Sequence, residues 1–276
     1  MSREWLLCDK CGDYVLLEDV FEPLYTTTLC TRCMHFPTLL GPDEEIDWVK
    51  YGNSNTYFGV ELEFHGDCNS GFKIDNKSKY LEYKCEESLL HGFEVVTHPA
   101  SYAMHYNTIS KLFKHKVYNS SITHKAAMHI HVNIDSPLFV GDVTYTVGRI
   151  MYFLYLHRDR FKELFGRDQD TYDRFCSLVP EGFEDATYAN FKYSAKRISE
   201  NMKKTYAVLI HEHTVEFRMF NTTNNKDKYM ENINIVLALI NIATMHSINR
   251  YDNFELFETV LDRTKRWMKY ETIMSN

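Results

Sequence analysis

Apolar and polar residues alternate along three short stretches that lie far apart in the chain. In residues 58–64, 128–134 and 214–220, one set of alternate positions is aliphatic or aromatic, and the other is rich in carboxylates, imidazoles and a guanidinium. Side chains of a strand alternate between its two faces, so each stretch predicts a strand with one apolar and one polar face. Two further runs, at 80–85 and 92–97, predict a second strand pair.

Apolar residues at helical spacing fill most of the remaining chain. They predict helices at 99–118, 142–165, 188–203, 226–248 and 254–273, the second of them ended by Gly166. The chain has 276 residues and is 44% hydrophobic, which is enough for one large domain and a small additional unit. We therefore expect an α+β fold with a mainly antiparallel sheet and helices outside it.

Four cysteines near the N-terminus form two Cys-x2-Cys pairs. The pairs are Cys8 with Cys11 and Cys30 with Cys33. Four thiolates at this spacing are typical of a structural zinc site, and a segment this small needs a metal to fold, although disulfides are the alternative. We therefore predict a zinc ribbon at 1–42 and a main domain at 50–276.

The polar faces of the alternating stretches carry ligands of the kind that hold metal ions. Glu61 and Glu63 share one face, His129, His131 and Asn133 share another, and Glu216 and Arg218 share a third. Each pattern alone has a simple explanation, such as solvated glutamates, solvated histidines or a cross-strand salt bridge. Three such faces in one chain favour a shared site, because this density of ligand chemistry is unusual on an ordinary exposed sheet.

Glu94 joins this set because its neighbours, Phe93 and Val95, are apolar. A buried carboxylate is unfavourable unless it is paired or bound to a cation. His98 lies next to Pro99 and is either part of the site or a cap on the strand. Carboxylates and imidazoles without thiols suit Mg²⁺ or Mn²⁺, and several glutamates together favour two or more ions with a polyphosphate. The chain has no P-loop and no dinucleotide-binding glycine motif.

Charge and hydropathy restrict the cellular context. The net charge of −7 argues against a general nucleic-acid coat, although a local basic patch is compatible with it. No apolar run has the roughly 18 to 20 residues that a bilayer requires, and the first residues lack the apolar core of a signal peptide. We therefore expect a cytoplasmic protein with no membrane partner.

The motifs resemble those of the amidoligase family, relatives of glutamine synthetase and glutamate–cysteine ligase that phages often encode. The resemblance covers residues 57–223 and rests on Gly59–Phe64, Gly92–Pro99, Met128–Asn133 and Thr214–Phe220. It implies a curved, mainly antiparallel sheet of the glutamine synthetase-like type, with ATP and an acid substrate entering from opposite ends. A phage-encoded member would work in the host cytoplasm.

The resemblance also implies roles for individual residues. Glu61, Glu63, Glu94, His129 and Glu216 would bind Mg²⁺ or Mn²⁺, His131, Arg218 and Lys204 would contact ATP, and Arg218, Glu216 and Glu61 would form the catalytic set. ATP would convert a carboxylate into an acyl phosphate, which an amine would attack to give an amide. Metals and Arg218 would neutralise charge on the transferred phosphoryl group.

One element departs from the family. Lys84-Cys-Glu-Glu-Ser-Leu89 replaces an Asp-Gly-Ser-like element, and Glu86 and Glu87 are candidate substitutes for its acid. Candidate substrate-side residues are Lys192, Lys196, Arg197, Lys203, Lys204 and Tyr206, although lysines at this spacing are also typical of a solvated helix face.

The leading hypothesis is an ATP-dependent carboxylate–amine ligase. Its zinc ribbon would either dock a protein, peptide or nucleic-acid acceptor or only stabilise the main domain. One alternative is a catalytically degenerate member that serves as a binding or virion protein. Another is a metal-dependent hydrolase or nuclease that uses the same acids and imidazoles. The identities of the acid and the amine, and the oligomeric state, stay open at this point.

Overall fold

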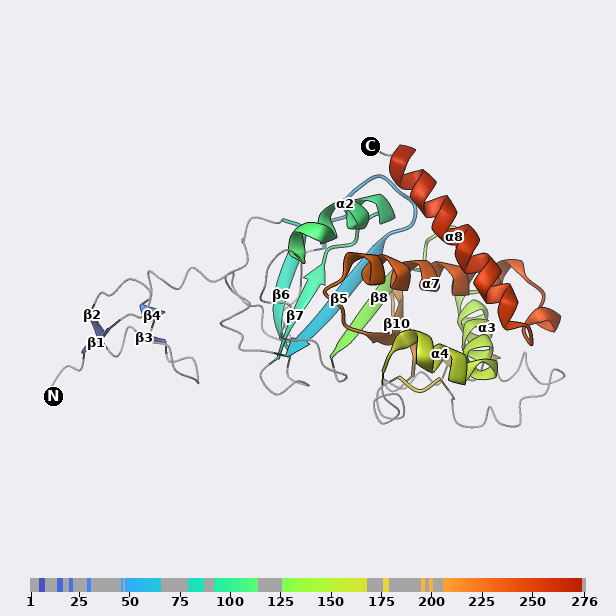
Figure 1. The fold of residues 1–276 in the computed structure, drawn as a ribbon, viewed down its shortest axis with the longest axis horizontal. Helices are drawn as coiled ribbons and strands as arrows, with labels where there is room; N and C mark the ends of the chain where they lie inside the picture. Colours follow the sequence, from blue (N-terminus) through green and yellow to red (C-terminus); the bar gives the residue numbers. More distant parts are fainter. Residues whose placement is uncertain are drawn as a thin grey trace.

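Six strands form one antiparallel sheet in the order β6-β7-β5-β8-β10-β9 (Figure 1). Their bounds are β5 Phe58–His65, β6 Leu81–Glu86, β7 Gly92–Thr97, β8 Ala127–Asn133, β9 Val208–Ile210 and β10 Thr214–Asn221. This computed structural model describes residues 46, 48–65, 79–86, 92–113, 126–167, 176–178, 195–196, 199–200 and 206–274, together with four short strands near the N-terminus. The predicted α+β class and the antiparallel sheet are confirmed.

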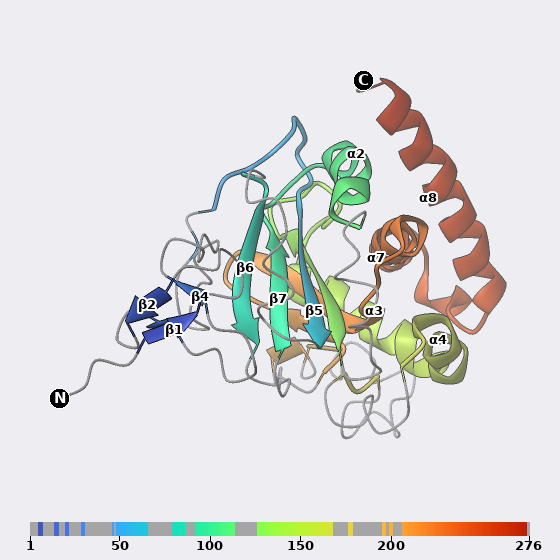
Figure 2. The same cartoon turned by 60° about the vertical axis from the view of Figure 1, so that its left-hand side comes forward.

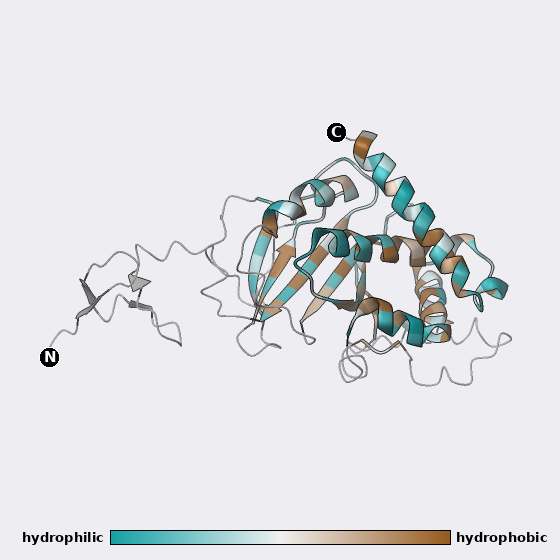
Figure 3. Ribbon diagram, viewed as in Figure 1, coloured by the Kyte–Doolittle hydropathy of each residue, from teal (hydrophilic) through white to brown (hydrophobic). Residues whose placement is uncertain are grey.

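Helices lie on the apolar face of this sheet. They are α2 Tyr102–Leu112, α3 Val143–Leu156, α4 Arg158–Phe165, α7 Lys226–Met245 and α8 Phe254–Met274, with a short 3-10 turn at Ile248–Arg250. Helix α7 is buried along most of its length between the sheet and α8 (Figure 2). Many residues of α8 are hydrophilic (Figure 3). Among the described helices, none has both the length and the apolar character needed to cross a bilayer.

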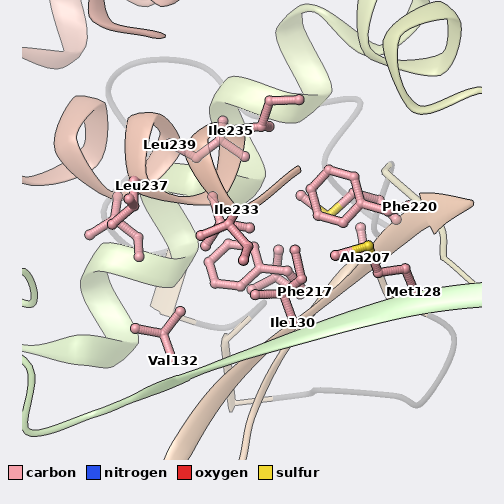
Figure 4. Close-up of a cluster of buried hydrophobic side chains, with 14 of the residues drawn as sticks. Met128, Ile130, Val132, Ala207, Phe217, Phe220, Ile233, Ile235, Leu237 and Leu239 are labelled. Carbon is pink, nitrogen blue, oxygen red and sulfur yellow. The ribbon is translucent and has the colours of Figure 1, made fainter. Parts of the chain in front are cut away.

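Alternation along the strands places one set of side chains in the core. Val60, Ile130 and Phe217 come from three neighbouring strands and are fully buried. Figure 4 shows Ile130 and Phe217 beneath Ile233 of α7. Because strand side chains have a period of two, burial of this face turns the intervening polar positions to the opposite face.

Strand β10 contains a bulge. Phe217 lies opposite Ile130 and Phe220 lies opposite Met128, so three steps along β10 match two steps along β8. The extra residue lets Phe217 and Phe220 both face the core. Glu216 and Arg218 stay on the polar side.

A buried polar cluster ties α2 to the sheet and to α7. His105 is fully buried, and its Nε2 donates to the carbonyl oxygen of Phe58 over 2.8 Å. Its Nδ1 lies 2.6 Å from the Tyr80 hydroxyl and 2.8 Å from the Tyr229 hydroxyl. Burial lowers the pKa of His105 to about 4, against a smaller opposing effect of the Phe58 carbonyl. The imidazole is therefore neutral in the folded protein near pH 7.

One predicted helix needs correction, and one strand was not predicted. The helix predicted at 142–165 is two helices, because His157 leaves helical geometry (φ −118°, ψ 23°) and its Nε2 donates to the carbonyl oxygen of Tyr251 over 2.7 Å. Asp142 is the N-cap rather than the first helical residue, and Gly166 ends α4 in the left-handed conformation as expected. Strand β9 was not predicted.

The other predicted helices are present among the described residues, although α2 begins at Tyr102 rather than at 99 and α7 ends at Met245 rather than at 248. Helix α2 begins after the N-cap Ser101, whose side chain accepts from the Met104 amide, and residues beyond 113 lie outside the described part. Of the helix predicted at 188–203, only residues 195–196 and 199–200 are described, and these are helical. Helices α7 and α8 match the predicted 226–248 and 254–273 closely.

Near the N-terminus, two short antiparallel pairs are described. Strand β1 (Trp5–Leu7) pairs with β2 (Tyr14–Leu16), and β3 (Val20–Phe21) pairs with β4 (Leu29–Cys30). Cys8, Cys11 and Cys33 lie outside the described residues, and only the backbone of Cys30 is described. The zinc ribbon and the two domain boundaries therefore stay predictions.

Candidate functional site

The polar face of the sheet brings together candidate ligands from three adjacent strands. Strand β8 lies between β5 and β10, and the register sets Glu61 opposite His129 and Glu216 opposite His131. Opposite residues of antiparallel strands have close side chains, so two carboxylates flank two imidazoles. The predicted convergence of these residues is present.

The two oxygens of Glu61 face different histidines. Oε2 lies 3.2 Å from His129 Nδ1, and Oε1 lies 3.3 Å from His131 Nε2. His131 Nδ1 lies 3.2 Å from the hydroxyl of Thr214. One carboxylate therefore joins both imidazoles of the central strand.

Glu216 is held from three directions. Its Oε1 accepts from Arg218 Nη1 at 2.5 Å and lies 3.2 Å from His129 Nδ1. Its Oε2 lies 2.7 Å from His211 Nε2. Burial opposes ionisation of Glu216, but His211, His129, His131 and Arg218 together lower its pKa to about 2. Glu216 is therefore ionised near neutral pH.

The pKa shifts of Glu61 and His131 follow from the same contacts. Burial works against the ionised form of Glu61, yet His131 and His129 hold the pKa of this carboxyl well below its usual range. Burial also opposes a charged His131, but Glu61 and Glu216 outweigh it and raise the pKa of the imidazole. The contacts thus stabilise the ionised form of Glu61 and the protonated form of His131 relative to the free side chains.

Glu63 and Glu94 extend the site toward the outer strand β7. They lie opposite each other on β5 and β7. Glu63 is buried, with Oε2 accepting from the Ala127 amide over 2.8 Å and Oε1 3.6 Å from His129 Nε2. Glu94 is half-buried and lies opposite Lys84 of β6. The acids therefore run across the face of four strands.

The donor set fits a divalent metal ion. Glu61, His131 and Glu216 each offer one ligand atom, and these atoms all lie within 4.8 Å of one another. The Nε2 of His131 is buried without a well-formed hydrogen bond to any described residue, although Glu61 Oε1 is 3.3 Å away. A buried nitrogen in that position needs a further partner. Mixed carboxylate and imidazole donors without sulfur suit Mn²⁺ or Mg²⁺.

His131 lies closer to the metal-type cluster than its expected nucleotide role implies. The family resemblance implies that His131 contacts ATP and that His129 binds a metal ion. Both imidazoles contact Glu61, and the three-residue cluster contains His131. Both histidines are therefore candidate ligands.

His98 acts on a separate part of the same face. Its Nδ1 accepts from the amide of Val49, so the ring proton lies on Nε2, which is 3.2 Å from Glu82 Oε1. These contacts attach the segment before β5 to the edge of the sheet. His98 therefore serves as the strand-end cap that was one of its two predicted roles.

Several predicted residues lie elsewhere or outside the described chain. Lys196 is exposed and forms a surface ion pair with Glu200 at 3.7 Å, as expected for a solvated helix face. Tyr206 is buried in the core. The candidates that lie outside the described residues are Glu87, Lys192, Arg197, Lys203 and Lys204.

His211 is the site residue that the sequence reasoning missed. It follows β9 at a tight turn, where its amide donates to the carbonyl oxygen of Thr214 over 2.8 Å. The turn brings its ring, which is about half exposed, onto Glu216 and 5.8 Å from the ring of His131. The signal that could have found it is the short apolar run Val208–Ile210, read as the other half of a hairpin with β10.

Two hollows elsewhere on the protein lack the glutamates and histidines of this site. They have volumes of about 570 and 590 Å³ and lie between α2 and the C-terminal half of α8. We therefore place the candidate site on the polar face of the sheet.

Comparison with known proteins gives one family. A family model described as "Putative amidoligase enzyme" matches residues 69–240, more than half of the chain. The matched segment includes β7, β8 and β10 with their candidate ligands, and it begins after β5. No curated protein matches the chain. A family match of this extent means that the chain belongs to the amidoligase family.

Proposed function

We propose that this protein is an ATP-dependent ligase that joins a carboxylate to an amine. A carboxylate oxygen attacks the γ-phosphorus of ATP, the bond to ADP breaks, and an acyl phosphate forms. The amine then attacks the acyl carbon, inorganic phosphate leaves, and the nitrogen loses a proton to give the amide. Activation is needed because a carboxylate does not react with an amine at neutral pH.

The observation that carries this proposal is the convergence of Glu61, His131 and Glu216 beside Arg218. Family membership supports a ligase. The cluster supports a site that can neutralise the negative charge of phosphate groups. Phosphoryl transfer depends mainly on positioning and on neutralisation of negative charge. A set of fixed carboxylates, imidazoles and one guanidinium suits that requirement.

In this proposal the site residues bind either metal ions or the phosphoryl group. Glu61, Glu63, Glu94, His129 and Glu216 hold Mg²⁺ or Mn²⁺, and His131 joins them because it contacts Glu61. When bound, the ions would offset charge on the phosphates. Arg218, oriented by its contact with Glu216, binds the transferred phosphoryl group. The guanidinium is planar and permanently charged, which suits phosphate oxygens.

Further parts of the proposal concern the whole chain. We assign the sheet to the glutamine synthetase-like type and residues 50–276 to the ligase domain. Residues 1–42 are the proposed zinc ribbon, which contacts an acceptor protein, peptide or nucleic acid or stabilises the main domain. A cytoplasmic location suits an enzyme that uses ATP.

The experiment uses hydroxylamine as a general amine. The full chain is incubated with ATP, MgCl₂, hydroxylamine and pools of carboxylic acids that include amino acids and short peptides. We expect ADP and a hydroxamate to form together, and only when an active acid is present. Arg218→Ala should lose both products, while Arg250→Ala, which removes an exposed guanidinium outside the site, should retain them.

Other results would point to the alternative functions. Cleavage of a phosphodiester without ATP would assign the site to a hydrolase or nuclease. Binding of ATP with no ADP formed from any acid pool, together with tight binding of a macromolecule through residues 1–42, would assign the chain to a catalytically inactive binding protein. Either result would overturn the ligase proposal.

A further inference from the structure

The outer side of α8 carries large apolar residues exposed to solvent. Trp267, Tyr270 and Ile273 are 60%, 55% and 63% exposed. Their spacing of three places them along one side of the helix, and the rings of Trp267 and Tyr270 lie 6.3 Å apart. Single exposed apolar residues are ordinary, but a contiguous row with two aromatic rings marks a contact surface.

The exposed charges of α8 are divided by sign between its two halves. The N-terminal half exposes Glu255, Glu258 and Asp262, and the C-terminal half exposes Arg263, Arg266 and Lys269. The helix dipole favours acids only in the first turn, and Asp262 already pairs with Arg266 at 2.6 Å. Glu258 and Lys269 have no ion pair with any described residue. Such a helix is complementary in charge to an antiparallel copy of itself.

A hollow lies beside the same helix. It has a volume of about 400 Å³, and its lining includes Met245 at the end of α7 and five residues of α8, which are Val260, Arg263, Thr264, Trp267 and Met268. Met245 is itself 73% exposed. Val260 and Trp267 are seven residues apart, about two turns, so the hollow and the Trp267 ring share one flank of α8.

The charges and the hollow give the same alignment for two antiparallel α8 helices. If Glu258 lies level with Lys269 of a second copy, the two-fold axis passes between residues 263 and 264. The same axis sets Trp267 of each copy level with Val260 of the other. A two-fold axis perpendicular to both helices keeps each flank on its own side, so Trp267 meets the hollow and Glu258 meets Lys269 on the opposite flank.

We propose that two copies of this chain form a dimer through α8, with each Trp267 seated in the hollow of the other copy. The two ion pairs between Glu258 and Lys269 fix the antiparallel register. Helix α8 lies on the helical side of the sheet, away from the glutamates and histidines, so both candidate sites remain accessible (Figure 2). The dimer is therefore independent of the proposed ligase activity.

Sedimentation velocity of the full chain tests the dimer over roughly 1 to 100 µM protein, where mass action separates monomer from dimer. We expect a concentration-dependent dimer. Trp267→Ala should raise the dissociation constant about tenfold or more, because a central aromatic anchor dominates such interfaces. Val140→Ala removes a side chain that is 66% exposed in the loop after β8 and should leave the dissociation constant unchanged.

Exchange of the two charges tests the register. Glu258→Lys and Lys269→Glu alone should each weaken the dimer, because each brings like charges together. The double variant should restore it, because the pair re-forms with its signs reversed. A wild-type monomer at every concentration would overturn the proposal and leave this surface to a different partner. A dimer that is insensitive to Trp267→Ala, or that is not restored by the double exchange, would also overturn it.

Discussion

Acidification should destabilise this protein through one buried imidazole. His105 is neutral and fully buried in the folded state, with a pKa lowered to about 4. In the unfolded chain its pKa returns to about 6.5. Between these values the unfolded state binds a proton that the folded state does not. The free energy of unfolding is therefore complete above about pH 6.5 and falls as the pH decreases toward 4.

The size of the effect follows from the two pKa values. A difference between about 6.5 and about 4 corresponds to about 3.4 kcal/mol once the pH is below both. At pH 5 the unfolded chain is almost fully protonated at this site and the folded protein is not. The expected loss from His105 alone is then about 2 kcal/mol relative to pH 7.5.

Urea denaturation at pH 7.5 and pH 5 measures this loss. The comparison is with His105→Gln, whose amide nitrogen can still donate to the Phe58 carbonyl but whose side chain does not titrate. We expect the pH-dependent loss to be about 2 kcal/mol smaller in the variant than in the parent. His213→Gln is the matched control, because the His213 side chain is 83% exposed.

The reasoning fails if His105→Gln loses as much stability between pH 7.5 and pH 5 as the parent does. The proton uptake would then belong to other groups. It also fails if His213→Gln flattens the pH dependence as strongly as His105→Gln, because the effect would then not be specific to the buried imidazole.

Three further outcomes are expected. Glu216→Gln should weaken Mn²⁺ binding about tenfold or more by electron paramagnetic resonance, whereas Glu212→Gln, with an 88% exposed side chain, should not. Arg218→Ala should lower the rate of acyl-phosphate formation by about 10² to 10³, measured as hydroxamate, with no comparable loss in melting temperature. Gly148→Ala should destabilise the fold by about 1 to 3 kcal/mol in thermal melts, because its Cβ would lie 2.6 Å from the backbone oxygen of Ala195.

Strand alternation gave the two faces of the sheet from the sequence alone. Val60, Ile130 and Phe217 were predicted to share the apolar face, and all three are fully buried. This works because the side-chain period of a strand is two, so burial of one face determines the other. The grouping of Glu61 with Glu216 on the opposite face follows from the same rule.

Features set by contacts between distant segments could not be read in this way. The apolar stripe of the helix predicted at 142–165 continues through His157, and only the bond from this residue to the Tyr251 carbonyl marks the break. Strand β9 has three residues, too few to show a period, so His211 had no visible partner. Alternation also assigns a face but not a neighbour, so it could not tell which imidazole meets Glu61.

The central position of β8 has a consequence for how the protein folds. Its two histidines receive their carboxylate partners from β5 on one side and β10 on the other, and Glu61 and His129 are 68 residues apart in the chain. Closure of long segments is slow and entropically unfavourable until the strands pair. The ligand cluster is thus completed only when both pairings of β8 exist. A bound ion would therefore slow unfolding more than it would speed folding. Ion binding would also indicate that the sheet is fully formed.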